Sequence, residues 1–556
     1  MKKVFLALCL TAALVTPGCI KVDNSLGKGL VDKSLLFDTY TAEFPLEEIQ
    51  LKPSEALSGY SDTRITLGAI RDPYFGLCTR EAAFNLIPAA DTLDFGTDPK
   101  AVSFVLNFAQ DTVSCADDSQ AHIFQNIYVT ELTKRLPEAD EDTRNTQEIP
   151  HGEEIITNGL ISYNGSGSLT FNFSQAFAQK YMEAIISTGP IFIDRDDDDD
   201  DDDDNGKYDE FLEKMPGIHL RTDVPEGDGG RINMFNFSCL TVSSNYYVRN
   251  NNVGQLTINS TWNGVRKDST FLVVPGEPEL IDESDYLEDN TKFYQYCFNR
   301  TTQSTTPGPL QDQLIVEGGG GLKPVILARE LQEKTREAIL AQGGNPDKAV
   351  IVKATIVLPF EMPENYEELK YYPSILSPTI QSTYETEDDE KYTAFAGLTD
   401  ASVSSEDQGD IDRSNLVYKP DITYHLQELL TREDLDSAND ADIWLLTIHT
   451  EKVANANGSL YDNEYYQNLM YASYYNSIYG GGYGYGGYGG YGSYGGYGYN
   501  NYYNYMMLAQ MMSASTQQTY SYNTELDKDR YYRAILCGYN SERAPMFRVT
   551  FAIPQD

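Results

Sequence analysis

Val102-Ser103-Phe104-Val105-Leu106-Asn107-Phe108 carries the pattern on which the fold class rests, a large apolar residue at every second position. Successive side chains of a β-strand point to opposite faces, so this spacing is typical of a strand with one buried face. The same period of two recurs further along the chain, at 169–173, 350–358 and 547–553. Gly, Pro, Asn and Asp cluster between these stretches, as turns require. The sequence therefore predicts a mainly β protein.

Helices are expected at two places only. The clearer helix covers 324–342, with Pro324 near its start and Gly343-Gly344 just past its end. Its apolar and small residues recur on one face, so we expect it to lie against a sheet. A second helix is predicted over 175–186, directly after a strand. Both would cover sheets and would not form a core of their own.

The length of the chain predicts two domains. Single cores rarely exceed about 250–300 residues, whereas this chain has 556 residues and 41% hydrophobic content. Thr, Ser, Pro and Gly cluster near 304–311, which favours a boundary there. We therefore expect two β-sandwich or barrel-like domains, 36–305 and 311–556, the second containing the helix 324–342.

Two low-complexity inserts interrupt these domains. An acidic loop at 194–210 contains nine consecutive aspartates, and a stretch at 461–512 is built mainly of Tyr, Gly and Asn. Adjacent like charges cannot pack together, so the acidic loop must be solvated. Tyr offers a flat apolar face with a hydroxyl, so the second insert could adhere to glycans or to copies of itself. The alternative is an expanded loop without a selected partner.

The charge balance excludes one class of partner. The chain has 84 acidic and 41 basic residues, a formal net charge of −43. A field of that sign repels nucleic acids and anionic lipid surfaces. Nucleic-acid binding is therefore excluded as a main function, and cations, basic protein surfaces and neutral glycans remain as partners.

The first 18 residues have the pattern of a lipoprotein signal peptide. Lys2-Lys3 precedes an apolar stretch at 4–15, which is too short to span a bilayer. Thr16-Pro17-Gly18-Cys19 follows, and places a small residue directly before a thiol that can be acylated. Thr16 departs from the usual Leu at that position. An ordinary signal peptide with an incidental cysteine is the alternative.

Cleavage before Cys19 would leave a lipidated protein. The polar segment 19–35 would then be a tether that holds the folded part away from the membrane. The prediction is an outer-membrane lipoprotein anchored by lipid. Acidic residues after the cysteine direct surface export in some bacterial lineages, but only Asp23 is present beside Lys21. Both the periplasmic face and the cell surface therefore stay open.

The remaining cysteines are widely spaced. No CxxC motif occurs, so zinc ribbons and thioredoxin-type redox motifs are not expected. One or two disulfides in an oxidising compartment and a set of buried free thiols are both compatible with the pattern. The residues concerned are Cys78, Cys115, Cys239, Cys297 and Cys537.

The end of the acidic loop contains a candidate calcium site. Asp201, Asp203, Asn205 and Asp209 follow the order D-x-D-x-N-G-x-x-D, which resembles calcium loops of the EF-hand or dockerin kind. The twelfth position, where an acid should close the coordination shell, is Leu212. Calcium is thus the one cofactor that the sequence suggests. The alternative is a solvated loop that attracts cations diffusely.

Other motifs are sparse. Asp followed by Thr or Ser and a small aliphatic residue occurs three times, a pattern that some gut bacteria use for O-glycosylation; the candidate acceptors are Thr92, Thr112 and Ser437. Motifs of serine hydrolases, zinc proteases and P-loop nucleotidases do not occur. Gly318 to Gly321 precedes Lys323 and predicts a turn between a strand and a helix. The five histidines show no metal-ligand spacing.

Several stretches together resemble a family of Bacteroidota outer-membrane lipoproteins catalogued only as a domain of unknown function. The most specific stretch is Asp72-Pro73-Tyr74-Phe75-Gly76, in which Pro73 fixes a turn, Gly76 relaxes it, and Tyr74 and Phe75 would dock on the sheet. The other stretches are Gly27-Lys28-Gly29-Leu30, Leu67-Gly68, Gly217-Ile218-His219-Leu220, Gly318 to Gly321, Lys353-Ala354-Thr355-Ile356-Val357-Leu358 and Tyr372-Pro373. The resemblance implies a two-part, β-rich outer-membrane lipoprotein and brings no catalytic residues.

Three functions remain to be distinguished. The first is a non-enzymatic accessory or binding subunit, beside an outer-membrane β-barrel protein in uptake or envelope assembly. The second is a surface adhesin or matrix component that uses the Tyr/Gly-rich insert. The third is a carbohydrate-active enzyme with buried acids, which the sequence cannot single out among so many carboxylates.

Overall fold

The computed structural model describes most of the chain between residues 36 and 555. The residues outside the description are 1–35, 56, 62–63, 89–92, 116, 138–142, 190–205, 238–240, 243–246, 249–253, 280–291, 295–296, 304–312, 386–390, 401–407, 434, 436–440, 455–519 and 556. Of the described residues, 52% lie in strands and 17% in helices. The strands form several antiparallel sheets, so the prediction of a mainly β fold is confirmed. Among the described residues, no helix combines the length and the apolar character that a membrane crossing needs.

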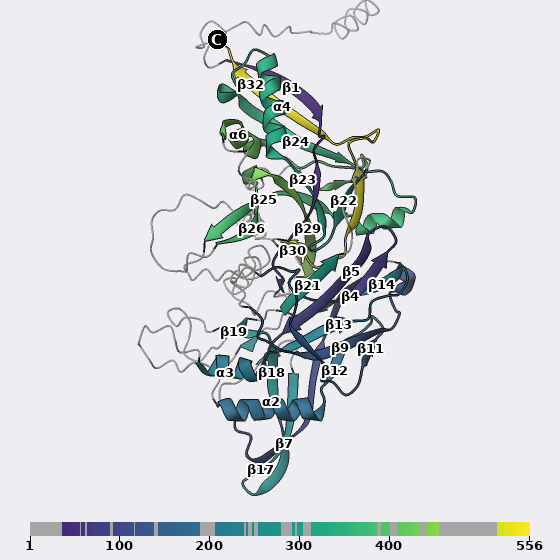
Figure 1. The fold of residues 1–556 in the computed structure, drawn as a ribbon, viewed down its shortest axis with the longest axis vertical. Coiled ribbons are helices and arrows are strands. Elements are labelled where there is room, and N and C mark those ends of the chain that lie inside the picture. Colours follow the sequence, from purple (N-terminus) through teal and green to yellow (C-terminus); the bar gives the residue numbers. More distant parts are fainter. Residues whose placement is uncertain are drawn as a thin grey trace, which may run out of the picture.

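Two sheets and two helices build the first core, in the lower half of Figure 1. The larger sheet has the order β10-β9-β13-β5-β4-β14-β8, with β11 on β9, β21 on β5 and β3 on β21. Its strands are β3 (Tyr60–Ser61), β4 (Arg64–Asp72), β5 (Gly76–Phe84), β8 (Gln110–Cys115), β9 (Gln125–Leu132), β10 (His151–Ile155), β11 (Ile161–Tyr163), β13 (Ile218–Thr222), β14 (Gly229–Asn236) and β21 (Cys297–Gln303).

The second sheet of this core has the order β12-β7-β17-β18-β6. Its strands are β6 (Leu86–Pro88), β7 (Thr97–Phe108), β12 (Leu169–Asn172), β17 (Gly254–Trp262) and β18 (Val265–Pro275). Helices α2 (Gln175–Thr188) and α3 (Gly206–Lys214) contribute buried side chains to the same cluster. The predicted helix at 175–186 is therefore present, and the Ser174 hydroxyl caps it by accepting the N–H of Phe177 at 3.1 Å.

The second core lies in the upper half of Figure 1. It combines the sheets β1-β32-β24-β28-β27, β2-β23-β29-β25-β26 with β30 on β29, and β22-β31. The strands are β1 (Phe37–Pro45), β2 (Gln50–Pro53), β22 (Gln313–Glu317), β23 (Leu322–Ile326), β24 (Val350–Pro359), β25 (Ile375–Glu385), β26 (Lys391–Gly397), β27 (Ile411–Asp412), β28 (Val417–Tyr418), β29 (Ile443–Ala454), β30 (Tyr520–Leu526), β31 (Arg533–Cys537) and β32 (Met546–Pro554). Helices α4 (Ala328–Ala341) and α6 (Thr423–Thr431) cover it.

Smaller elements complete the described chain. A four-stranded sheet has the order β16-β15-β20-β19, with β15 (Thr241–Val242), β16 (Tyr247–Val248), β19 (Glu277–Glu279) and β20 (Lys292–Tyr294). Three short 3-10 helices are η2 (Asp118–Gln120), η3 (Pro346–Lys348) and η4 (Tyr366–Tyr371).

The first two strands belong to the second core, although the sequence analysis assigned everything from residue 36 to the first domain. β1 pairs antiparallel with β32 over its whole length, from Phe37 opposite Pro554 to Pro45 opposite Met546. β2 pairs with β23. The cause is the alternation of Tyr40, Ala42 and Phe44, whose side chains pack against the second cluster. The chain therefore contributes β1 and β2 to the second core, then forms the first core, and then forms the rest of the second core.

The helix predicted at 324–342 begins later than expected. Pro324 lies inside strand β23, opposite Leu51 of β2, and not in the first turn of a helix. Every residue of β23 is buried, so tertiary packing decides the conformation of this stretch. The helix starts at Ala328, whose N–H donates to Asp442 at 3.0 Å. For the same reason, Gly318 to Gly321 turn between two strands, whereas a strand and a helix were expected.

Two strands change their inward face at a β-bulge. Val102 was expected on the buried face with Phe104, but its side chain is exposed and Ala101 is buried in its place. The register between β17 and β7 shifts at this point. In β24, Val352 is exposed for the same reason, because the pairing with β32 skips it. An extra residue in one strand reverses the alternation on one side of it.

Candidate functional site

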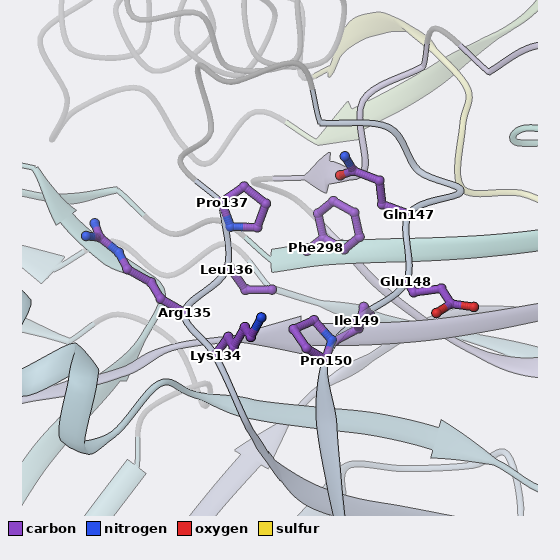
Figure 2. A pocket seen from close by; sticks show the side chains of 9 residues that line it. All are labelled: Lys134, Arg135, Leu136, Pro137, Gln147, Glu148, Ile149, Pro150 and Phe298. Atoms are coloured by element: carbon purple, nitrogen blue, oxygen red, sulfur yellow. The ribbon is translucent and has the colours of Figure 1, made fainter.

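A hollow of about 410 Å³ opens beside the large sheet of the first core. Figure 2 shows its two sides, which are the two arms of the connection between β9 and β10. Lys134 to Pro137 form one arm and Gln147 to Pro150 form the other. Phe298 of β21 lies between them. The arms are joined at their base, where the N–H of Thr133 donates to the carbonyl of Pro150 at 2.9 Å.

The floor of the hollow is apolar and fixed. Leu136, Ile149 and Phe298 are buried in one small cluster with Tyr60. The rings of Tyr60 and Phe298 pack edge-on, with their centroids 5.3 Å apart. The Tyr60 hydroxyl donates to the carbonyl of Pro137. Aromatic pairs in this geometry stabilise beyond their buried area, by about 0.5–1.5 kcal/mol. The floor is therefore a preformed surface.

The rim carries charges of both signs. Arg135 donates to Asp209 of helix α3 at 2.7 Å, so that arm is tied to the first core. Lys134 is exposed, and no described residue forms an ion pair with it. On the opposite arm the Glu148 side chain is 92% exposed and lies 4.0 Å from Arg300. The hollow thus offers apolar contact below and solvent-facing charge above.

Beside the floor, a hydrogen-bonded network lies on the same face of the sheet. Ala83 is the cross-strand neighbour of both Phe298 and His219, which places His219 next to the floor. His219 Nε2 lies 3.3 Å from Glu81 Oε2, and Arg300 lies 3.3 Å from the same oxygen. Burial lowers the pKa of His219, which outweighs the opposite effect of Glu81. His219 is therefore a neutral imidazole that donates from Nε2 at neutral pH.

The carboxylate of this network is held ionised. Burial raises the pKa of Glu81, but the hydrogen bonds and charges of His219 and Arg300 outweigh it, so the pKa is lowered overall. The hydroxyl of Thr130 lies 3.4 Å from His219 Nδ1, which gives the order hydroxyl, imidazole, carboxylate. This order is also that of a nucleophilic triad. Thr130 is only 1% exposed, however, so its hydroxyl cannot meet a substrate and the network supports the sheet.

One pair of residues in this region could not be predicted from the sequence. His151 of β10 and His219 of β13 stack with ring centroids 4.1 Å apart, although they lie far apart in the chain. Their contact depends on the order of strands in the sheet, which spacing along the sequence does not reveal. Among the described residues, no group of three or more His, Cys, Asp or Glu could hold a metal ion.

The stretch Asp72 to Gly76 forms the turn between β4 and β5 and lies where the two cores meet. One Asp72 oxygen accepts the N–H groups of Tyr74 and Phe75 at 2.8 and 2.9 Å, and the other accepts from Arg533 of β31. Gly76 has φ +73° and completes the turn. Phe75 is buried, whereas Tyr74 is 45% exposed and its hydroxyl donates to Gln313 of β22. This motif links the first core to the second.

Only part of the candidate calcium site is described. Asp201, Asp203 and Asn205 lie outside the described residues, and Asp209 lies in the first turn of α3, bound by Arg135. Leu212, at the twelfth position, is fully buried in the first core. It faces the core because α3 begins at Gly206 and its apolar face joins the first cluster, where Phe211 packs against Tyr181 of α2. Calcium binding by this loop stays a prediction.

Most other predicted sites fall outside the description. Cys19, the tether, the Tyr/Gly-rich insert 461–512, Thr92 and Ser437 are among the residues not described. Thr112 is half-buried on β8, the edge strand, opposite Met234. The four described cysteines are buried free thiols, namely Cys78, Cys115, Cys297 and Cys537.

Comparison with known proteins adds no relative: no family model, no curated protein and no solved structure matches the chain. The resemblance to the Bacteroidota lipoprotein family therefore stays a prediction that rests on the quoted motifs. The function must be argued from the described residues and the leader sequence.

Proposed function

We propose that the protein is a non-enzymatic outer-membrane lipoprotein, anchored through Cys19, that binds a protein partner in the hollow between Lys134 to Pro137 and Gln147 to Pro150. The observation that carries the proposal is the combination of a fixed apolar floor with solvent-facing charges on both rims. Binding sites are commonly concave, mostly apolar and preformed, with a few polar groups that orient the ligand.

The geometry suits an extended protein segment. The two prolines that line the arms, Pro137 and Pro150, are partly exposed and offer flat apolar faces above the buried ring of Phe298. Lys134 and Glu148 stand on opposite sides, so a segment that crosses the hollow would meet one charge of each sign. The partner we propose is a β-barrel protein of the same membrane, since a lipid anchor would hold both in one plane.

Site-specific cross-linking tests this proposal in the intact lipoprotein. A photoreactive residue in place of exposed Gln147 should give one discrete cross-linked product after mild detergent extraction. Adding Lys134→Glu should reduce its yield, because it reverses the rim charge without touching the floor. The control probe replaces exposed Lys267 on the β17–β18 hairpin, which belongs to the other sheet of the first core. Equal products from both probe positions, or none from Gln147, would reject the hollow as the binding site.

A further inference from the structure

A buried arginine at the boundary between the two cores keeps unused hydrogen-bond donors. Arg80 of β5 is 1% exposed, and its Nη1 donates to the hydroxyl of Thr301. Its Nε and Nη2 have no acceptor among the described residues. The other fully buried arginine, Arg231, shows the usual outcome: it donates to Asn233, Ala121, Ile123 and Tyr163 at 2.7–3.2 Å. A buried charged group that lacks a hydrogen-bond partner destabilises the fold, so a bound ligand that accepts from Arg80 is expected.

A second unpartnered group lies beside Arg80. Asn145 is 2% exposed, and neither atom of its side-chain amide has a partner among the described residues. Thr301 joins the two residues, because its N–H donates to the Asn145 carbonyl at 2.6 Å while its hydroxyl accepts from Arg80. Two buried side chains therefore present unused polar atoms on either side of one threonine.

Both side chains face the turn Gly318 to Gly321, which only glycine permits. A Cβ at Gly319 would lie 2.4 Å from Arg80 Nη1, and a Cβ at Gly320 would lie 2.8 Å from Asn145 Oδ1. Gly319 also has φ +54°, and neither its N–H nor that of Gly320 donates to a described residue. Successive free N–H groups at such a turn are typical of anion-binding nests.

The charges around the turn leave Arg80 without a carboxylate partner among the described residues. The ammonium of Lys323 is buried against the carbonyls of Gly319 and Gly321, at 3.1 and 3.3 Å. Glu317 is the one carboxylate on the turn, and it accepts the N–H of Leu322 at 2.9 Å. The neighbouring pairs Asp527–Arg530 and Asp72–Arg533 are balanced within themselves. Among the described residues, no carboxylate forms an ion pair with Arg80.

We infer that Arg80, Asn145 and the turn Gly318 to Gly321 bind one small monovalent anion of the halide class, which is chloride in most surroundings. An anion satisfies the unused donors and gives the buried guanidinium of Arg80 a negative partner, whereas a water molecule would do only the first. The anion contacts strand β5 of the first core and the β22–β23 turn of the second. It therefore stabilises the boundary between them.

Melting of the full-length protein in chloride tests this at constant ionic strength, with the bulky anion gluconate as replacement. Ligand that binds only the folded state stabilises it in proportion to the logarithm of its concentration above Kd. We expect the melting temperature to rise by at least about 2 °C between about 5 and 500 mM chloride. Crystals soaked in bromide should show one anomalous peak within hydrogen-bond distance of Arg80 Nη2.

The matched variant is Asn145→Asp, which has the same shape and supplies the missing negative charge. It should lose the chloride response while keeping its stability in gluconate. The control Asn107→Asp, on strand β7 where Thr170 donates to the side chain at 2.6 Å, should keep the response. Chloride-independent melting of the wild type, or bromide crystals without a peak at Arg80, would overturn the proposal. The bromide experiment decides even if Asn145→Asp fails to fold.

Discussion

Asp72 stabilises both its own turn and the contact between the two cores. Its first oxygen closes the turn of its own hairpin, and its second accepts from Arg533 in the other core. The side chain is 3% exposed, so both functions are carried out away from water. The local part was predictable, because Asp before Pro is a turn signal. The partner was not, because Arg533 is one of 41 basic residues and nothing in its neighbourhood marks it.

We expect Asp72→Ala to reduce the free energy of unfolding by about 3–5 kcal/mol, because it removes the buried carboxylate that pairs with Arg533 and accepts two N–H groups of the turn. The control is Asp412→Ala. Asp412 accepts the N–H groups of Ser414 and Asn415 in the same way, but at the surface, so its loss should lower the free energy of unfolding much less than the loss of Asp72. Urea unfolding measures both variants. Equal losses would mean that the contact with Arg533 contributes nothing.

Lys323 makes stability depend on pH. Burial and, more weakly, Arg80 lower its pKa to about 7, although Glu317 and Asp527 act in the opposite direction. Between that value and its ordinary value of 10.5, the unfolded chain binds more protons than the folded chain, so stability rises with pH in this window.

We therefore expect the free energy of unfolding to increase from pH 7 to pH 10 in the wild type. The increase should be smaller in Lys323→Met, which has no proton to lose at this position. Urea titrations at several pH values provide the measurement. A Lys323→Met protein with an unchanged slope against pH would contradict the assignment.

Strand β24 illustrates what pattern recognition achieves at the scale of an element. A period of two correctly indicated a strand at 350–358 and the buried side of Ala354, Ile356 and Leu358. It placed Val352 on the same side, which is wrong because the bulge lies between Ile351 and Lys353. A bulge depends on the partner strand, so the sequence of β24 alone could not reveal it.

Because of the bulge, the same substitution should change the free energy of unfolding by different amounts at two neighbouring positions. Val352→Thr should alter the free energy of unfolding by less than about 0.5 kcal/mol, because Val352 is 52% exposed. Ile351→Thr should cost more than about 1 kcal/mol, because it removes buried apolar surface and buries a hydroxyl. A regular strand would give the reverse order, so thermal or urea unfolding of the two variants distinguishes the alternatives.

At the scale of the whole molecule, the fold class could be predicted and the connectivity could not. Alternating strands, few helices and the length of the chain indicated a β-rich protein with more than one core, and the described residues contain two large buried clusters. The assignment of 37–53 to the second core could not be predicted, because β1 alternates like many other strands. The hollow was missed too, since its arms meet only after β9 and β10 pair with each other.

Removing residues 36–53 should weaken the second core and spare the first. The deletion exposes the edges of β32 and β23, which β1 and β2 cover. Hydrogen exchange followed by mass spectrometry should then show faster exchange in β32 and unchanged exchange in β7 of the first core. Faster exchange in both strands to the same degree would mean that the two cores unfold as one unit.

The pairing of β1 with β32 also determines when the second core can fold during synthesis or export. Asp38 and Gln555 are hydrogen-bonded across 517 positions of sequence, so the sheet of the second core cannot close until the last strand has been delivered. Contacts of such long range form slowly, because the loop entropy is lost before any contact compensates for it. A chain that emerges from a translocation channel with β1 first would hold that strand unpaired throughout its passage. In such a chain, the fold would be completed only after the whole polypeptide has left the channel.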